Sequence, residues 1–355
     1  MRQDRAGGLT VGVEPPGVPW VAITANPYSG AGKNREIVGR LQRALEGHGL
    51  AVRVLWDWVE RKTVLSDGRW MERCKCVVVA GGDGTVADVL NEVAEIPGVS
   101  LAVMPIGNEN LFARQFGYRD AEQVAAAVAR GQTMGIDVGE VRDAGCGVRD
   151  AGEDASRMTQ TAQRTARLFT LMVSAGFDAE VVHRVQQWRD RGGALRRARR
   201  WSYFRPTLKA MLGYRYPTVE LVADGYVVRG CHAMVFNLPQ YACGLRFTPQ
   251  CVANDGLLHW VVFPKRGALA LGRYLALAAM GSRHLGSTGV QWGAAREVEL
   301  RGIAGAWTKE PGAALEDSLC PGLGGRVPVQ VDGDPAGFTP VRLKVRSHAA
   351  RIVVT

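Results

Sequence analysis

The sequence predicts two domains: an N-terminal doubly wound α/β domain and then a mostly antiparallel β-sandwich. Three observations support this fold class. The chain has 355 residues, more than the roughly 250 at which single hydrophobic cores stop growing. Its first third alternates short apolar runs with helical segments, and its second half is rich in short strands. We therefore expect an α/β domain at 18–138, a flexible linker or insertion at 139–166, and a sandwich at 167–355.

The first domain is predicted from strand and helix segments that follow one another along the chain. Cys76–Ala80 is a nearly continuous valine run, which is typical of a parallel strand buried on both faces. The predicted strands are Val21–Thr24, Val52–Trp56, Cys76–Ala80 and Leu101–Met104, and the predicted helices are Arg35–Glu46, Thr85–Ala94, a helix beginning in Asn110–Phe116, and Ala121–Ala129. Strand and helix alternate as a doubly wound sheet requires.

The second domain is predicted from strands alone. Arg142–Ala166 contains only two large apolar residues, so we interpret it as an exposed linker. Asp224-Gly225 between two apolar runs indicates a hairpin. The predicted strands are Leu168–Val173, Thr218–Ala223, Tyr226–Val228, Ala233–Asn237, Leu257–Phe263, Glu297–Leu300, Val327–Val331, Val341–Val345 and Arg351–Val354.

Composition excludes several classes of protein. The seven cysteines are odd in number and contain no CxxC pair, which argues against a disulfide framework or a zinc site and favours the cytoplasm. The N-terminus lacks the apolar core of a signal peptide. The most apolar stretch, Ala268–Leu285, is too short and too interrupted to span a membrane. We expect a cytoplasmic protein that is at most peripheral to a membrane, and its formal charge of +10 favours anionic partners.

Three glycine-containing segments each leave a predicted strand and open a predicted helix. They are Asn26–Lys33, Val77–Thr85 and Met104–Arg114. Glycines let backbone N–H groups approach phosphate, and a helix N-terminus favours an anion. One such turn alone is as often simple fold punctuation, and the first is not a Walker A loop. Three junctions along one edge of a parallel sheet indicate a nucleotide cleft.

The segment Val77–Thr85 also carries side chains suited to chemistry. Asp83 places a carboxylate between glycines at a strand end, where no packing role is expected to need the charge. Thr85 offers a hydroxyl and is expected to serve as the N-cap of the next helix. A tight turn with capping residues is the simpler alternative. Glycines on both sides of Asp83 exceed what capping requires, so we favour a catalytic role.

In this order and spacing, the three segments resemble the catalytic domain shared by diacylglycerol kinases, sphingosine kinases and their bacterial relatives, whose fold is NAD kinase-like. The family's patterns are an NPxSGxG loop, a GGDGT loop and a PxGTxNxxAR segment. The second half is similar too. Gly176–Glu180 resembles the family's GFDAE, Asp255–Leu258 its DGLL, and Asp332–Asp334 its DGE motif. The resemblance runs from about Val18 to the C-terminus, apart from two insertions.

The resemblance implies roles for particular residues. The residues implied to line the ATP site are Asn26, Pro27, Ser29, Gly30, Gly81, Gly82, Asp83, Gly84, Thr85 and Asn108. The general base would be Asp332 or Asp334, and Asp178 and Glu180 would contact the lipid. A structural Mg²⁺ would be held by Asp255 and the backbone carbonyls of Val252 and Leu257, a donor set that suits a hard cation. The chain departs from the family where Asn108 replaces a threonine and where Glu109 adds a negative charge near the phosphates.

We therefore expect an ATP-dependent lipid kinase. It would transfer the γ-phosphoryl group of Mg·ATP to the hydroxyl of a diacylglycerol or sphingoid-like membrane lipid, with the active site between the domains. The alternatives are an NAD kinase and a catalytically silent relative that senses a nucleotide or lipid. The basic, aromatic-containing run Arg184–Lys209 favours contact with an anionic membrane, although a solvated helix would look the same. No nucleic-acid partner is expected, and a homodimer is possible.

Overall fold

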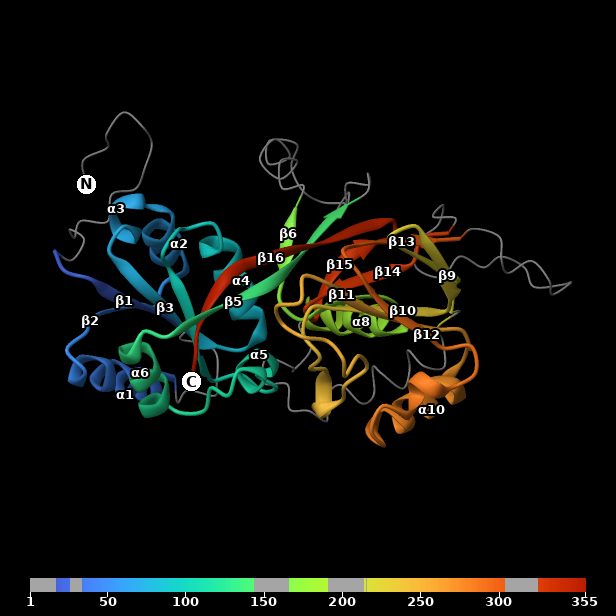
Figure 1. Cartoon of the computed structure of the whole chain (residues 1–355), viewed down its shortest axis with the longest axis horizontal. Coiled ribbons are helices and arrows are strands. Elements are labelled where there is room, and N and C mark those ends of the chain that lie inside the picture. The colour runs from blue at the N-terminus through green and yellow to red at the C-terminus, as the bar shows by residue number, and fades with distance from the viewer. Residues whose placement is uncertain (1–16, 26–33, 144–165, 191–213, 215, 304–324) are drawn as a thin grey trace, which may run out of the picture. The chain divides into compact units, whose positions relative to one another are not determined.

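The computed structural model describes residues 17–25, 34–143, 166–190, 214, 216–303 and 325–355. The chain divides into two compact units (Figure 1). Unit 1 comprises Met1–Asp137 and His348–Thr355, and unit 2 comprises Val138–Ser347. Strand β5 (Thr133–Asp143) carries the chain from unit 1 into unit 2, and β16 (Val341–Val353) carries it back.

Unit 1 is built on a parallel sheet. Its strands are β1 (Trp20–Ala25), β2 (Ala51–Leu55), β3 (Cys74–Gly81) and β4 (Ser100–Pro105), in the order β2-β1-β3-β4. The end of β16 joins this sheet beside β4, where Ile352 pairs with Leu101. The valines of β3 are fully buried, as expected for a strand covered on both faces. The predicted α/β fold of this half is confirmed.

The helices of unit 1 follow the predicted alternation, with two additions. They are α1 (Asn34–Gly47), α2 (Trp58–Ser66), α3 (Gly68–Met71), α4 (Asp83–Val93), α5 (Leu111–Gln115) and α6 (Ala121–Arg130). Helices α2 and α3 were not predicted. Asp57 caps α2 and Asp67 caps α3 through side-chain acceptors, a signal in the sequence that indicates short helices there. Helix α4 begins at Asp83, two residues before the predicted start.

Unit 2 contains two antiparallel arrays of strands that share one core. One has the order β12-β11-β10-β7-β14-β15, and the other has the order β16-β13-β8-β9 with β5 and β6 beside it. The strands new to the description are β6 (Arg167–Phe169), β7 (Met172–Gly176), β8 (Val219–Ala223), β9 (Tyr226–Gly230), β10 (His232–Phe236), β11 (Leu258–Phe263), β12 (Gln291–Ala295), β13 (Glu297–Gly302), β14 (Pro328–Val331) and β15 (Asp334–Phe338). Buried residues of both arrays, such as Val173 and Leu221, belong to one hydrophobic cluster. The predicted β-sandwich is confirmed.

Two α-helices and two short 3₁₀ helices described in unit 2 were not predicted. They are α8 (Phe177–Asp190), α10 (Ala268–Ala279) and the short 3₁₀ helices η4 (Ala242–Gly244) and η5 (Arg283–Gly286). The predicted strand Leu168–Val173 is two strands, β6 and β7, separated at Thr170-Leu171. The predicted hairpin at Asp224-Gly225 is present, with positive φ at both residues. None of the described helices is long and apolar enough to cross a membrane.

The domain boundaries differ from the prediction at two points. Strand β5 runs to Asp143, so the first residues of the predicted linker at 139–166 form sheet, and Val141 there is buried in the core of unit 2. The last eight residues, His348–Thr355, belong to unit 1 and not to the sandwich. The sequence did not predict that the chain returns to unit 1 at its end, because the residue pattern of a strand does not indicate which sheet the strand joins.

Candidate active site

The carboxyl ends of β3 and β4 bring two of the predicted glycine-containing segments together in unit 1. The parallel register pairs Ala80 with Met104 and Gly81 with Pro105, so both loops leave the same edge of the sheet. The N–H of Ile106 donates to the carbonyl oxygen of Gly81 at 3.2 Å. In open α/β sheets this edge is where ligands bind.

Glycine is required where the two loops touch. A Cβ on Gly107 would lie 2.7 Å from the Cα of Gly82, and a Cβ on Gly81 would lie 2.7 Å from the Cβ of Thr85. Both distances are shorter than carbon atoms tolerate, so the backbones of Gly82 and Gly107 are in direct contact, and the side chain of Thr85 packs against the backbone of Gly81. By contrast, a Cβ on Gly84 would meet nothing within 4 Å. Of the predicted nucleotide-binding glycines, Gly81 and Gly82 are therefore required by packing, and Gly84 is not.

Asp83 has a structural role that was not expected from the sequence. Its carboxylate accepts hydrogen bonds from the backbone N–H groups of Leu111 (3.0 Å) and Phe112 (2.9 Å), which open α5. Burial raises the pKa of Asp83, those two amides act in the opposite direction, and the charge of Glu109 adds to the rise. Asp83 therefore fastens the GGDGT loop to the start of α5. The side chain therefore has a packing role at this edge of the sheet, and a catalytic role for Asp83 stays a prediction.

Asn110 is a site residue that sequence reasoning missed. It has a left-handed backbone with φ of 50°, and its side chain both accepts from the N–H of Gly107 (2.9 Å) and donates to the carbonyl of Gly107 (2.8 Å). This closes the loop into a fixed turn. Asparagine tolerates positive φ better than most residues, so its place just before a helix was the available signal. Asn108, which was predicted to bind nucleotide, is exposed at the tip of this turn.

Thr85 does not cap α4 as expected. The N-cap is Gly82, which makes no side-chain capping bond. Thr85 lies in the first turn and covers Gly81. Among the described residues, therefore, the N–H groups that open α4 are not capped by the N-cap side chain, which is the arrangement that favours an anion. The remaining predicted nucleotide ligands, Asn26, Pro27, Ser29 and Gly30, lie outside the described residues.

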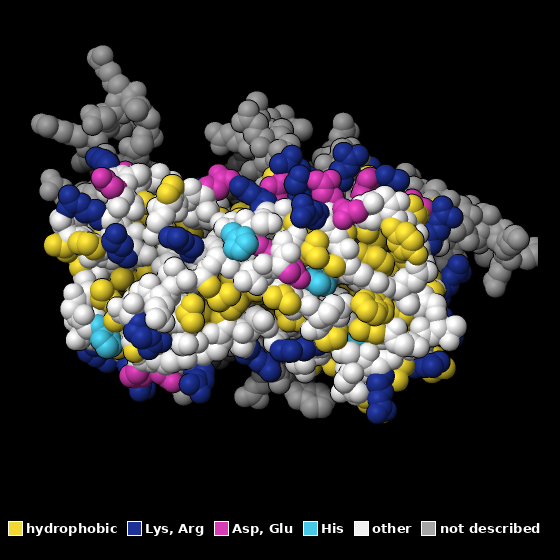
Figure 2. Space-filling view, in the orientation of Figure 1, with side chains coloured by type: hydrophobic (Ala, Val, Ile, Leu, Met, Phe, Trp, Pro, Cys, Tyr) yellow, Lys and Arg dark blue, Asp and Glu magenta, His cyan; other side chains and the backbone are white. Residues whose placement is uncertain are grey.

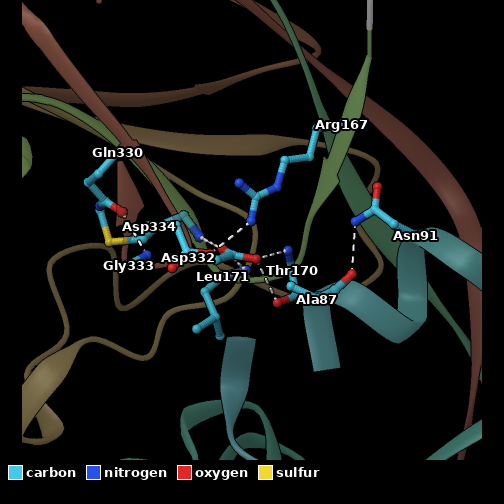
Figure 3. A network of polar contacts seen from close by, with 10 residues as sticks. Ala87, Asn91, Arg167, Thr170, Leu171, Gln330, Asp332, Gly333 and Asp334 are labelled. Atoms are coloured by element: carbon cyan, nitrogen blue, oxygen red, sulfur yellow. Dashed lines mark hydrogen bonds and ion pairs between the residues drawn. The ribbon is translucent and has the colours of Figure 1, made fainter. Parts of the chain in front are cut away.

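In unit 2, Asp332 is held at the turn between β14 and β15. It is 8% exposed, and each carboxylate oxygen accepts two hydrogen bonds (Figure 3). The donors are the N–H (2.7 Å) and hydroxyl (3.0 Å) of Thr170 and the N–H groups of Leu171 (2.8 Å) and Met172 (2.9 Å). Burial raises the pKa of Asp332, and these bonds oppose the rise. With its acceptor positions filled, Asp332 ties this turn to the turn between β6 and β7.

Asp334, the second candidate base, has a different environment. Its side chain is 56% exposed and pairs with Arg167 at 3.1 Å (Figure 3). It begins β15, two residues after Asp332, with Gly333 at φ of 88° between them. Of the two carboxylates in this motif, Asp334 is the one that is exposed to solvent.

The GFDAE segment is joined to the same turn by a side chain that was not predicted, Gln330. Its amide nitrogen donates to the carboxylate of Asp178 and to the hydroxyl of Ser174, both at 3.0 Å, and its oxygen accepts from the N–H of Gly333 (2.8 Å). Tyr241 donates to the other carboxylate oxygen of Asp178 at 2.6 Å. A lone polar residue inside the apolar strand β14 was the signal for this link.

Glu180, the other predicted lipid contact, pairs on its own helix. Its carboxylate lies 2.5 Å from the guanidinium of Arg184, one turn along α8. Both side chains are mostly buried, at 15% and 24% exposed. Arg184 is the described beginning of the predicted basic run, and most of Arg184–Lys209 lies outside the described residues.

At the predicted Mg²⁺ site, the carboxylate of Asp255 already has partners within the protein. Asp255 accepts from the N–H of Leu257 (3.0 Å) and contacts Nε2 of His259 at 2.8 Å, so both carboxylate oxygens are engaged. Val252 is 51% exposed. In the part of the chain that the structure describes, no three His, Cys, Asp or Glu side chains cluster as a metal site requires. A cation at Asp255 stays a prediction from the resemblance.

Comparisons with known proteins agree with the fold. Residues 20–141 match the family described as diacylglycerol kinase catalytic domain. Residues 171–354 match the YegS C-terminal NAD kinase beta sandwich-like domain. A crystal structure of a diacylglycerol kinase from Bacillus anthracis has a TM-score of 0.59 and 14% identity, covering 96% of this chain and 98% of that chain. At this identity the likeness shows a shared fold.

Curated relatives match shorter parts of the chain. A protein of Cronobacter sakazakii named "Probable lipid kinase YegS-like" is 26% identical over 227 residues, which cover 61% of this chain and 66% of the relative. The diacylglycerol kinase of Bacillus subtilis is 38% identical over 68 residues, which cover 18% of this chain and 22% of the relative. The matches thus span less than two thirds of the length of these relatives.

Proposed function

We propose, from the premise that the chain belongs to the family of diacylglycerol kinase-type lipid kinases, that it transfers the γ-phosphoryl group of ATP to the hydroxyl of a membrane lipid. The acceptor class is a diacylglycerol or sphingoid-like alcohol. Such a reaction is catalysed mainly by positioning and by neutralising the charge of the phosphoryl group. Mg²⁺ enters as part of the substrate, Mg·ATP.

The observation that carries the proposal is the contact between the two loops of unit 1. Gly82 and Gly107 meet backbone to backbone at the carboxyl ends of β3 and β4. Glycine at both positions leaves main-chain N–H groups accessible at the N-terminus of α4, whose N-cap, Gly82, has no side chain to occupy them. These N–H groups would donate to the phosphates of ATP, where the helix dipole also favours negative charge.

Other described residues would either hold the two loops in place or accept the proton of the lipid hydroxyl. Asp83 and Asn110 fix the loops, because their side chains bind only backbone groups of this edge. Asp334 would accept the proton of the lipid hydroxyl, since Asp332 has no acceptor position left. Asp178 and Glu180 would lie beside the lipid head group, as the resemblance implies.

An assay with radiolabelled ATP and Mg²⁺ tests this function. The purified chain is incubated with diacylglycerol, ceramide, sphingosine and undecaprenol in mixed micelles and, in a separate reaction, with NAD. Labelled lipid is counted after extraction, and labelled NAD is counted in the aqueous phase. We expect label in one lipid class, and none in the Asp334→Ala variant. Label in NAD and in no lipid would identify an NAD kinase instead. ATP binding without label in any acceptor would identify a silent relative, for which the charge of Glu109 beside the phosphates gives a reason.

A further inference from the structure

Helix α10 of unit 2 presents an outward face that is almost entirely apolar. On its inner side Tyr274 and Ala278 are buried, and Leu271 packs against the cluster of Phe177, Tyr216 and Cys231. On its outer side Leu269 is 93% exposed, and Met280, directly after the helix, is 57% exposed. These are among the most exposed large apolar side chains that the structure describes.

The exposed residues form one continuous face. Positions 269, 272, 273, 276 and 280 are all exposed, and their spacing places them within about 100° on a helix of 3.6 residues per turn. Arg273 is the one charged side chain among them, and the others are Leu269, Gly272, Ala276 and Met280. A helix face that meets only water normally carries several polar side chains. This face has an apolar centre and a single cation.

The sequence on both sides of α10 carries positive charge only. No Asp or Glu occurs between Gly256 and Arg296, whereas Lys265, Arg266, Arg273, Arg283 and Arg296 do. Lys265 precedes the helix, Arg283 follows it, and both are exposed. Where Figure 1 places α10, Figure 2 shows Lys and Arg side chains and no acidic side chain among the residues described. Exposed apolar side chains with a basic border are typical of helices that lie in an anionic lipid surface.

We propose that the outward face of α10, with Lys265 and Arg283 at its two ends, docks on an anionic lipid bilayer. Leu269 and Met280 would enter the boundary between head groups and acyl chains. The side chains of Lys265, Arg273 and Arg283 would bind lipid phosphates. A helix of 12 residues is about 18 Å long, enough to lie along the surface and too short to cross it. The inference deepens the proposed function and rests on it, because a kinase for a membrane lipid must reach the bilayer.

Vesicle co-sedimentation of matched variants, without ATP, tests the docking. The apolar variant is Leu269→Gln with Met280→Gln, and the charge variant is Lys265→Gln with Arg283→Gln. The control is Val59→Gln, which changes a side chain of unit 1 that is 50% exposed. Vesicles are phosphatidylcholine with phosphatidylglycerol, or phosphatidylcholine alone. Because all four sites are exposed, thermal unfolding should show that each variant is folded.

We expect the chain to bind the anionic vesicles and to bind phosphatidylcholine alone far more weakly. The apolar variant should lose more than roughly tenfold in binding. The charge variant should lose roughly 25-fold, since each basic residue near the surface contributes about fivefold, and its binding should depend less on salt. Val59→Gln should bind as the unchanged chain does.

Other results would overturn the docking surface. Unchanged vesicle binding in both variants would exclude α10 from the contact. A dimer that dissociates in the apolar variant, with vesicle binding retained, would make this face a contact between two copies of the chain. The proposed kinase function fails separately: if vesicle binding depends on α10 while a short-chain, soluble diacylglycerol is never phosphorylated, the surface stands and the reaction does not.

Discussion

The GGDGT loop of unit 1 and the turn Asp332-Gly333-Asp334 of unit 2 (the DGD turn) are both held by an aspartate side chain, but the two aspartates accept different numbers of hydrogen bonds. In each, a motif aspartate binds the backbone of a segment distant in sequence. Asp83 accepts two N–H groups from the start of α5. Asp332 accepts three N–H groups and a hydroxyl from the turn before β7. In the DGD turn the buried Asp332 therefore anchors the backbone, while its neighbour Asp334 remains exposed.

The largest loss of stability is expected on removing the Asp332 side chain, because it accepts more hydrogen bonds than Asp83 does. Asp332→Ala would leave three buried N–H groups and a hydroxyl without an acceptor, so we expect about 4 kcal/mol lower stability. Urea unfolding followed by fluorescence measures this. The matched control is Asp334→Ala, an exposed carboxylate two residues away, which should cost less than about 1 kcal/mol. Equal losses in the two variants would mean that Asp332 is not the fastening.

The second largest loss of stability is expected on disturbing the contact between Gly82 and Gly107 in unit 1. Gly107→Ala would place a Cβ 2.7 Å from the Cα of Gly82 and 2.8 Å from Oδ1 of Asn110. We expect about 2 kcal/mol lower stability and weaker ATP binding, because the loops must separate. Gly84→Ala in the same segment meets nothing within 4 Å and should leave the melting temperature nearly unchanged. If both glycines tolerate alanine equally, the loops do not meet as described.

Removing the charge of Asp83 should lower stability by a smaller amount, and this amount should depend on pH. Asp83→Asn keeps one acceptor oxygen, so we expect about 1 kcal/mol lower stability near neutral pH. Burial raises the pKa of Asp83 in the folded chain. A carboxyl with a raised folded pKa contributes stability that is fully present below the unfolded pKa and is lost as pH rises through the folded pKa. The advantage of the unchanged chain over the variant should therefore shrink as pH rises from below 3.8, the ordinary value.

Thermal melts of both proteins from pH 3 to pH 7 measure that advantage, in buffers of equal ionic strength because exposed charges are screened by salt. An advantage that grows with pH would reverse the direction assigned to the pKa of Asp83. It would also mean that the two amides of α5 outweigh burial at this carboxylate.

The smallest effect is expected at the exposed ion pair of unit 2. Arg167→Ala removes the partner of Asp334, and both side chains are substantially exposed, at 37% and 56%. Pairs of this kind contribute little, so stability should change by less than about 0.5 kcal/mol. Urea unfolding checks this value, and a large loss would show that Arg167 belongs to the fastening of the DGD turn.

The fold was largely predictable because its signals are local. The valine run of β3, the glycine turns after β3 and β4, and the hairpin at Asp224-Gly225 each depend on a few neighbouring residues. The return of His348–Thr355 to unit 1 was not predictable, because strand pairing over such a separation leaves no local pattern. Helix α10 was noticed only as an apolar stretch, because its two faces differ in partners and not in polarity.

The site was predictable as a set of positions and much less as a set of roles. The motifs correctly placed Asp83 at a strand–helix junction and Asp332 at a turn. The sequence could not show that backbone N–H groups would occupy their oxygens. Gln330 and Asn110 were missed because their partners, Asp178 and Gly107, are defined by the folded geometry. A side chain's role depends on what remains unpaired around it, and that is known only after folding.

The most direct test of the central claim is amide hydrogen exchange of the purified chain with and without saturating Mg·ATP. The account predicts slower exchange with ATP at the start of α4 (82–85) and at 107–112, which comprises the turn before α5 and its first two residues. These amides would donate to phosphate or become more rigid. Peptides from α10 should be unchanged. Slower exchange elsewhere in the chain, with no change at 82–85 and 107–112, would contradict the placement of ATP at this edge of the sheet.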